Sequence, residues 1–190
     1  MPTMGDPRFE RALGYICSHS EEGAMGLIVN KSAPGITFNG LLAQVGIDPA
    51  PGTAKDKEKN KNLSPLLEAE ERPILFGGPV EPGRGFVLHS QDYLSKDSSL
   101  AVSPDVAMTA TVDILRAIVR GTGPSRSIVA LGYAGWGPGQ LEMEIQENGW
   151  LICDMNEELL YGADVETKYE RALATLGVDL SLLSGDAGHA

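Results

Sequence analysis

The chain has 190 residues, of which 42% are apolar and 22% charged, and its formal net charge is −11 at pH 7. This length and composition fit one globular domain with a core of its own, and no run approaches the roughly 18 continuous apolar residues that a membrane-spanning helix requires. The acidic balance disfavours direct binding of nucleic acid, because such binding depends on neutralising phosphates with basic side chains.

The first third of the chain predicts a β-hairpin and a short helix. Residues 11–19 and 24–31 are rich in strand-forming residues, and the sequence SEEG between them is typical of a turn. A helix is expected over residues 36–47, with Thr37 as its N-cap and Gly46 at its C-terminal end.

The segment that follows, residues 49–66, is rich in Pro, Lys, Asp and Asn. Such a composition cannot bury much apolar surface. We therefore interpret it as a flexible insertion, and we expect a single domain that covers residues 1–190.

The middle of the chain predicts further strands and one helix. Residues 72–90 predict a second pair of strands joined by a Pro/Gly turn, and residues 99–109 predict one short strand followed by a turn. Apolar residues recur at helical spacing over residues 111–121, where Thr111 is the expected N-cap and Gly121 the expected end.

The last third begins with a continuous apolar run, residues 127–134, which indicates a central strand. A helix is expected over residues 138–148, with a proline at its first position. Residues 150–154 predict a strand, and residues 156–161 and 165–176 predict two helices. Because strands and helices mix without strict alternation, the sequence predicts an α+β domain.

The sequence LGYAGWGPGQLEMEI, residues 131–145, places four glycines between an apolar strand and a helix. This layout can bind phosphate, because backbone N–H groups at a helix N-terminus point outward. The GxGxG spacing matches neither the dinucleotide-binding motif nor the P-loop, and Pro138 removes one N–H donor. A tight structural turn is therefore favoured, although Trp136 could also line a pocket for an uncharged or planar ligand.

A second glycine-rich sequence is ILFGGPVEPGRGFVLH, residues 74–89. Gly77 and Gly78, at the end of a predicted strand, permit a close approach of the backbone, and Arg84 could bind a carboxylate or phosphate. The simpler interpretation is that Arg84 pairs with Glu81 or faces water.

The two cysteines, Cys17 and Cys153, are too few for a disulfide framework. Cys17 and His19 share one face of a predicted strand, and His89 could approach them to form a thiol–imidazole pair. Packing of the cysteines in the core, in reduced form, is the favoured interpretation. The sequence has no CxxC spacing and its three histidines are far apart, so no metal site is predicted.

Six segments carry a resemblance to a known family, and they follow one another along almost the whole chain. They are GDPRFERALGYICSHSEEGAMGLIVNK, TFNGLL, ILFGGPVEPGRGFVLH, ALGYAGWGPGQLEMEI, NGWLICD and LGVDLSLLSGDAGHA. In these segments the chain resembles the YqgE/AlgH family of bacterial proteins. The resemblance implies a single α+β domain with a mixed, partly barrel-like β-sheet and flanking helices, in a cytoplasmic protein. It implies no catalytic residues and no cofactor. The family is associated with the regulation of alginate biosynthesis and is often described as a transcriptional regulator.

The N-terminus departs from the family pattern. Family members usually carry an apolar strand of the type LLIAMP just before the segment with which this chain begins, MPTMGDPRF. Two expectations stay open: a start further upstream, or a sheet that lacks this edge strand and leaves its neighbour exposed.

We interpret the chain as a non-enzymatic protein that binds a small molecule or a partner protein through a groove between the two glycine-rich segments. Arg84 would contact an anion, Trp136 would provide a stacking surface, and polar side chains would form hydrogen bonds. The candidate residues are Asn30, Gly77, Gly78, Arg84, His89, Gly135, Trp136 and Gln140. Two alternatives stay open: a transcriptional regulator that acts directly on DNA, and an enzyme or redox sensor that uses Cys17.

Overall fold

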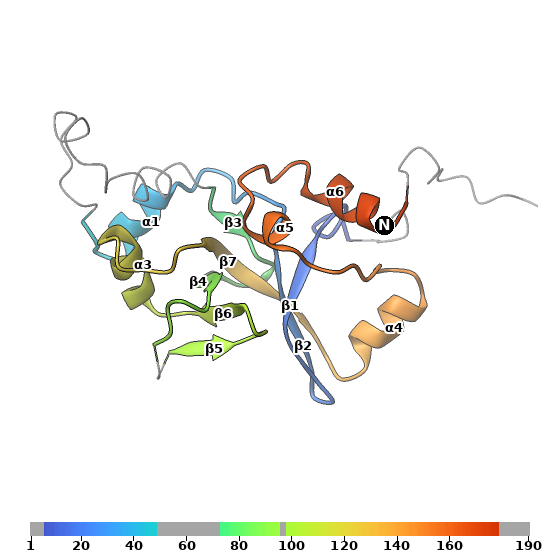
Figure 1. The fold of residues 1–190 in the computed structure, drawn as a ribbon. Coiled ribbons are helices and arrows are strands. Elements are labelled where there is room, and N and C mark those ends of the chain that lie inside the picture. Colours follow the sequence, from blue (N-terminus) through green and yellow to red (C-terminus); the bar gives the residue numbers. More distant parts are fainter. Residues whose placement is uncertain (1–5, 49–72, 96–97, 179–190) are drawn as a thin grey trace, which may run out of the picture.

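The computed structural model describes residues 6–48, 73–95 and 98–178, which form a mixed β-sheet with helices packed against it (Figure 1). Hydrogen-bonded strands follow the order β1-β2-β7-β4-β6-β5, and β3 pairs with β7 beside this path. The sheet curls into a half-barrel with five helices around it. The α+β fold class and the partly barrel-like sheet are therefore confirmed, whereas the predicted insertion at residues 49–66 lies outside the described residues.

The elements have the following bounds. The strands are β1 (Gly14–Ser20), β2 (Gly23–Ile28), β3 (Leu75–Phe76), β4 (Val80–Ser90), β5 (Ser99–Ala101), β6 (Val106–Thr109) and β7 (Ser127–Trp136). The helices are α1 (Phe38–Gln44), α3 (Val112–Val119), α4 (Gln140–Gln146), α5 (Glu157–Tyr161) and α6 (Lys168–Thr175).

The central strand is β7, as its continuous apolar run predicts. Successive side chains of a strand point to opposite faces. Ile128 and Ala130 pack in one apolar cluster, which includes residues of α5 and α6, while Val129 and Leu131 pack in a second, which includes residues of α1 and α3. Because other elements cover both faces of β7, neither face needs polar side chains, and the sequence of the strand is one apolar run.

The predicted N-terminal hairpin is confirmed. β1 and β2 pair antiparallel from Gly14 opposite Ile28 to Ser20 opposite Gly23. A bulge interrupts the pairing at Cys17. β2 continues into the sheet through β7, while β1 ends the strand order.

The prediction of a second pair of joined strands over residues 72–90 is wrong in its pairing. β3 and β4 do not pair with each other: β3 lies parallel to β7 and β4 lies antiparallel to it, both opposite Ala130. Between them, the backbone of Gly77 and Gly78 crosses β7 in close contact with Gly132 and Tyr133. The two glycines make this crossing possible because a side chain there would collide with backbone.

The prediction of a single short strand over residues 99–109 is also wrong. The segment forms two strands, β5 and β6, which pair antiparallel from Ser99 opposite Thr109 to Ala101 opposite Ala107. The SPD sequence between them makes the turn, where the Ser103 hydroxyl accepts a hydrogen bond from the backbone N–H of Val106.

Two predictions after β7 need correction as well. Residues 150–154 do not form a strand, because no described backbone group forms a ladder with them. Pro138 does not occupy the first position of α4, since this helix begins at Gln140 after a left-handed Gly139. The strand β7 reaches Trp136, so the chain turns later than the sequence suggests.

The predicted helix ends are largely confirmed. The Thr37 hydroxyl accepts a hydrogen bond from the backbone N–H of Gly40 at 3.1 Å, and Gly46 adopts a left-handed φ of 67° just after α1. Thr111 caps α3 by position, without a side-chain hydrogen bond. Within the described residues, no helix is long and apolar enough to cross a membrane.

The crossing at Gly78 gives a direct test of the fold. A Cβ at Gly78 would lie under 3.0 Å from backbone atoms of Tyr133 and Ala134, and its φ of 154° is unfavourable for other residues. We expect Gly78→Ala to lower the free energy of unfolding by about 2–4 kcal/mol, measured by urea denaturation. The matched control is Gly83→Ala, where a Cβ meets no atom within 4 Å. We expect a change within about 1 kcal/mol there, and equal losses in both variants would contradict the role of the crossing.

Candidate functional site

The structure brings the two glycine-rich segments together, but it leaves no space between them. The backbone N–H of Gly77 donates to the carbonyl oxygen of Leu131 at 2.8 Å, and a Cβ on Gly132 would collide with the carbonyl oxygen of Gly78. Gly135 lies within β7, opposite Met25 of β2. The glycines at this contact serve backbone packing, and a groove between the segments is not formed there.

Trp136 and Gln140 lie at the corner after β7, and their polar atoms are bonded to neighbours. The Trp136 indole is 8% exposed and donates to a carboxylate oxygen of Glu144 at 3.0 Å. The Gln140 side chain accepts from the backbone N–H of Gly137 and donates to the other Glu144 oxygen. The glycine-rich stretch therefore forms a turn that side-chain hydrogen bonds hold in place. This agrees with the tight structural turn that its glycine spacing favours.

The remaining three candidates lie apart from this corner and from each other. Asn30 bridges two backbone groups of the N-terminal segment, accepting from Leu13 N–H and donating to Arg11 C=O. Arg84 pairs with Glu81 on the surface. His89 is buried between the Thr109 hydroxyl and its neighbour's carbonyl, and burial lowers its pKa. The eight residues do not line one cavity, and their role in ligand binding stays a prediction.

Cys17 is packed in the core and has no histidine as a hydrogen-bond partner among the described residues. Its thiol donates to the carbonyl oxygen of Tyr15 at 3.5 Å, and burial raises its pKa to about 12. The ring of His19 pairs with Glu142, and that of His89 with Thr109. This geometry gives no support to the alternative in which Cys17 is activated by a histidine.

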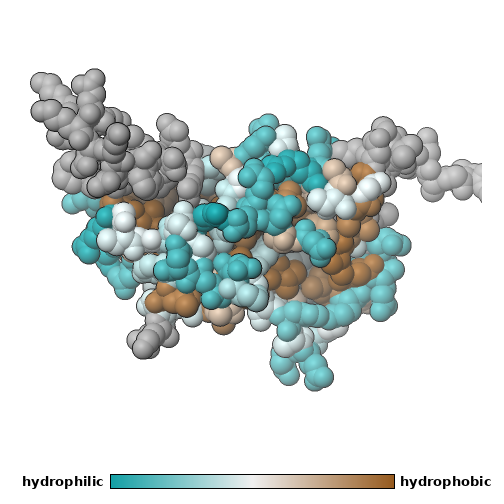
Figure 2. Space-filling view, viewed as in Figure 1, coloured by the Kyte–Doolittle hydropathy of each residue, from teal (hydrophilic) through white to brown (hydrophobic). Residues whose placement is uncertain are grey.

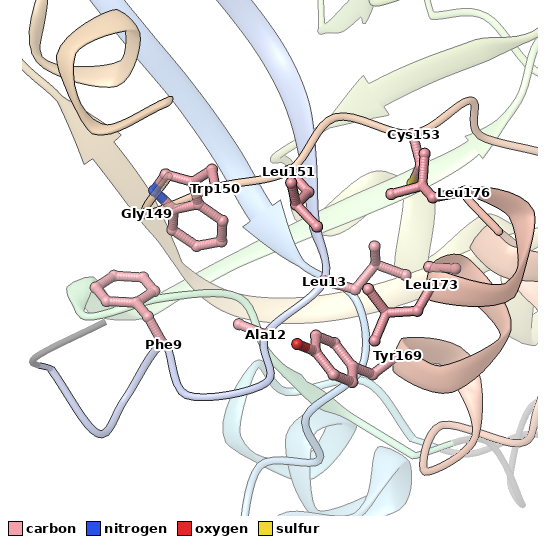
Figure 3. A pocket seen from close by; sticks show the side chains of 11 residues that line it. Phe9, Ala12, Leu13, Gly149, Trp150, Leu151, Cys153, Tyr169, Leu173 and Leu176 are labelled. Atoms are coloured by element: carbon pink, nitrogen blue, oxygen red, sulfur yellow. The ribbon is translucent and has the colours of Figure 1, made fainter. Parts of the chain in front are cut away.

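An apolar groove instead opens between α6, the segment after α4 and the N-terminal segment, and we call it the edge groove (Figure 3). Figure 3 shows that its side chains come from these three parts of the chain, with Phe9 and Trp150 at one end, Cys153 and Leu176 at the other, and Leu13 between them. The lining residues are Phe9, Ala12, Leu13, Gly149, Trp150, Leu151, Cys153, Tyr169, Ala172, Leu173 and Leu176.

One wall of the edge groove is the apolar face of α6. Tyr169, Ala172, Leu173 and Leu176 follow the spacing i, i+3, i+4, i+7, which places them on one side of a helix. Glu170 and Arg171 of the same helix lie off this stripe and form ion pairs with Arg11 and Glu158. The helix is therefore fixed with its apolar stripe toward the groove, and its last turn leaves Leu176 38% exposed.

The other wall is held in place by Glu144. One of its carboxylate oxygens accepts hydrogen bonds from the indole N–H groups of both Trp136 and Trp150, at 3.0 and 2.7 Å. The two indoles meet edge to face, and Phe9 meets Trp150 in the same way. These contacts fix the position of Trp150. The residues that follow it, 151–153, therefore border the groove although they belong to no strand.

The surface around the edge groove is unusually apolar. Leu151 and Ile152 are 42% and 71% exposed, beside the exposed Leu176. Figure 2 shows apolar side chains gathered on this face over the segment between α4 and α5, below α6. Large apolar patches on soluble proteins commonly mark binding surfaces. Cys153 borders the groove, half-buried, and burial together with Asp154 raises its pKa.

The cavity at the floor of the groove has a volume of about 40 Å³. At roughly 10–15 Å³ per water, this is space for about three waters. Pockets for drug-sized ligands measure roughly 300–1,000 Å³. The cavity therefore suits one apolar side chain from a larger molecule rather than a whole small-molecule ligand.

Local structure explains two other hollows. The first is lined in part by Lys168. This lysine is fully buried, and its amine donates to the carbonyl oxygen of Leu160 at 2.8 Å, near the C-terminus of α5. Burial lowers its pKa to about 8. The lysine satisfies a carbonyl at the end of a helix, as cations commonly do there. The second hollow, about 410 Å³, lies beside the exposed ion pair of Arg126 and Glu157.

The residues of the edge groove escaped the sequence interpretation, although two signals were present. The stripe on α6 is visible as helical spacing at Tyr169, Ala172, Leu173 and Leu176. Residues 150–154 carry an exposed apolar run, whose composition predicts a strand. What the sequence could not show is that these two segments face each other. Within the described ranges, no group of three or more His, Cys, Asp or Glu side chains could hold a metal ion.

Comparison with known proteins gives consistent matches over the chain. The AlgH-like family profile (DUF179) matches residues 1–181. A UPF0301 protein of Rhodopseudomonas palustris (strain HaA2) and the UPF0301 protein blr1492 of Bradyrhizobium diazoefficiens are each 53% identical over 190 residues, covering 100% of this chain and 83% and 85% of those proteins.

Two solved structures are also similar. The solution structure of the AlgH protein from Pseudomonas aeruginosa matches with a TM-score of 0.74 and 40% identity, over 100% of this chain and 92% of that one. The crystal structure of protein DIP2367 from Corynebacterium diphtheriae matches with a TM-score of 0.62 over 90% and 81% of the two chains. At 18% identity the second match shows the fold alone.

The bracing of Trp150 predicts the effect of Glu144→Gln. This change removes the negative charge that accepts two indole hydrogen bonds, and we expect a loss of about 1–3 kcal/mol in the free energy of unfolding. The measurement is urea denaturation followed by tryptophan fluorescence. Glu147→Gln, on the same helix end but exposed, is the control and should change stability by less than about 0.5 kcal/mol. If the two variants were equally stable, Glu144 would not brace the wall.

The two thiols should differ in reactivity. Cys17 is buried with a pKa of about 12, whereas Cys153 borders an open groove. We expect iodoacetamide to alkylate Cys153 at least tenfold faster than Cys17 in the native protein at pH 8, measured by mass spectrometry of peptides. In urea both should react alike. Faster reaction of Cys17 would instead support a catalytic or redox thiol.

Proposed function

The chain belongs to the AlgH-like family, and we propose that it is a non-catalytic binding protein that holds an apolar segment of a partner protein in the edge groove. The single observation that carries this proposal is the exposed apolar surface around the groove. Leu151 and Leu176 line the apolar cavity and are still exposed, and Ile152, next to Leu151 in the chain, is exposed as well. Burying such side chains against a partner is favourable by about 25 cal/mol per Å².

The chemistry of the groove supports binding rather than reaction. Its lining is apolar apart from the Tyr169 hydroxyl, the Trp150 indole N–H and the thiol of Cys153. The thiol has a raised pKa, and nucleophilic catalysis by cysteine requires a lowered one. The Trp150 N–H is already bonded to Glu144.

The shape of the groove favours a protein segment over a small molecule. The cavity admits one side chain, while the apolar surface continues beyond it along residues 150–153. A partner segment can place one anchor in the cavity and cover the neighbouring leucines. A regulatory role, as the family resemblance suggests, would then act through a protein partner rather than through DNA, in keeping with the net charge of −11.

A library of random peptides displayed on phage, selected on the full immobilised chain, tests the proposal. We expect the selected peptides to be rich in apolar residues and to bind with micromolar dissociation constants, measured by fluorescence anisotropy of synthetic copies. Leu176→Glu should weaken their binding at least tenfold, because it places a charge at the rim of the groove. Leu151→Glu should act in the same direction.

The control is Leu94→Glu, which alters a leucine outside the groove that is more exposed than Leu151 and Leu176. It should leave the dissociation constants within twofold. The unfolding transitions of all variants should be measured first, so that a loss of binding is compared between folded proteins. Peptides that bind Leu176→Glu and Leu151→Glu as tightly as the unchanged chain would overturn the edge groove as the binding surface.

A further inference from the structure

The amine of Lys168 lies in the core and has bonding capacity beyond its bond to α5. Its side chain is fully buried, and the amine donates to the carbonyl oxygen of Leu160 at 2.8 Å. An ammonium group has three N–H donors, yet no carboxylate of a described residue forms an ion pair with this one. Because burying an unpaired cation is costly, the site favours the uncharged amine, which has a free lone pair.

The charges around Lys168 act in the same direction as burial. Burial is the main cause that lowers the pKa of Lys168 to about 8, the positive charge of Arg171 lowers it further, and Glu158 opposes both. About half of these amines are therefore uncharged at pH 8, against fewer than about one in a hundred for a lysine of ordinary pKa. An uncharged lysine amine is a nucleophile.

A small cavity adjoins Lys168 and limits the size of a molecule that could react with it. Residues of β3, β7, α5 and α6 line the cavity, at the place where both helices meet the sheet (Figure 1). Its volume is about 20 Å³, which is space for one or two waters at roughly 10–15 Å³ each. Ala163 of the lining is exposed, so the cavity reaches the surface. A molecule of a few atoms fits this space, whereas a longer carbon chain does not.

Tyr161 lines the same cavity and carries a polar group without a partner. Its hydroxyl oxygen is buried and forms no hydrogen bond with a described residue. Burial raises the pKa of this phenol, so the hydroxyl keeps its proton and can donate it. A buried hydroxyl that lacks a partner is destabilising. The group therefore points to a ligand that accepts a hydrogen bond.

We propose that Lys168 is a site of reversible carbamylation by carbon dioxide. The lone pair of the amine attacks the carbon of CO₂, one C=O electron pair moves onto oxygen, and one N–H proton leaves to solvent. The product is the anion R–NH–COO⁻. Its remaining N–H keeps the hydrogen bond to Leu160, and the Tyr161 hydroxyl donates to a carbamate oxygen. This site is separate from the edge groove and does not depend on the function proposed for it.

Carbon dioxide suits the cavity in size and polarity. It is a linear molecule of three atoms without net charge, and the lining is apolar apart from Lys168 and Tyr161. An aldehyde with a carbon chain would exceed the space. Carbon dioxide also becomes an anion only after it has reacted, so no charge has to enter an apolar cavity.

The start of α6 favours the anion once it has formed. Lys168 is the first residue of this eight-residue helix, and its N-cap, Thr167, makes no side-chain hydrogen bond. Side chains of a helix lean toward its N-terminus, where the partial positive charge of the backbone stabilises anions and disfavours cations. The same position therefore favours the carbamate over the ammonium group.

The test is a ¹³C NMR spectrum of the full chain with ¹³C-labelled bicarbonate at pH 8. We expect a carbamate signal that Lys168→Met abolishes. The control is Lys31→Met, because Lys31 also donates to a backbone carbonyl, that of Arg8 at 2.9 Å, but is only half-buried. This variant should leave the signal unchanged.

A second measurement locates the carbamate even if Lys168→Met does not fold. The carbamate is trapped in the unchanged chain as its methyl ester, and the peptides are analysed by mass spectrometry. We expect at least tenfold more ester on Lys168 than on Lys31. Equal yields on both lysines, or no ester on Lys168, would overturn the proposal.

Tyr161→Phe separates a role in the carbamate from a role in folding. Without CO₂ the variant should be at least as stable as the unchanged chain, because the hydroxyl has no partner to lose among the described residues. With CO₂, the concentration that gives half occupancy should rise at least fivefold. An unchanged half-occupancy concentration would overturn the assignment of Tyr161 to the site.

The pH profile tests whether the buried amine is the reacting group. Below pH 8 the ammonium group loses two protons to become a carbamate, while above pH 8 the amine loses one. At a fixed concentration of dissolved CO₂, we expect the ratio of carbamate to free lysine to rise about 100-fold per pH unit below pH 8 and about tenfold above it. A profile without this change of slope near pH 8 would contradict the assignment.

Discussion

The contact of two backbones determines how this sheet is arranged. Gly77 and Gly78 cross the central strand β7 against Gly132 and Tyr133, at a distance that no side chain permits. This crossing puts β3 and β4 on opposite sides of β7. With β7 covered on both faces, the helices divide into two groups, α1 and α3 with one apolar cluster, and α5 and α6 with the other. The glycines therefore make this arrangement of the strands possible.

The position of the edge groove follows from this arrangement. α6 packs its apolar stripe toward the sheet near β1, while the chain between α4 and α5 passes the same strand without joining it. Glu144 holds that passing segment through two indole N–H groups, so an exposed apolar wall is fixed opposite the helix. An apolar surface that is braced in this way costs little conformational entropy on binding, which favours affinity.

The sequence predicts the helices and strands better than it predicts which of them lie next to each other. The first hairpin, the central strand and the capped helix after Thr37 depend on local patterns, and all are confirmed. Residues 150–154 have the composition of a strand, but a strand also requires a partner, which periodicity cannot show. The glycines at positions 77 and 78 correctly indicated a close approach, yet the approaching group was backbone rather than ligand. The groove was missed because its walls are distant in sequence, and only the spacing on α6 pointed to one of them.

The most direct test of the central claim is the NMR spectrum of the backbone amides, recorded with and without a saturating amount of an apolar peptide selected on the immobilised chain. The binding surface lies at the edge groove, so the amide signals of Leu151, Cys153 and Leu176 should shift most when the peptide binds. The amides of β5, at the end of the sheet far from the groove, should be unchanged. Shifts at β5, or none at Leu151, Cys153 and Leu176 while the peptide is bound, would contradict the proposed binding surface.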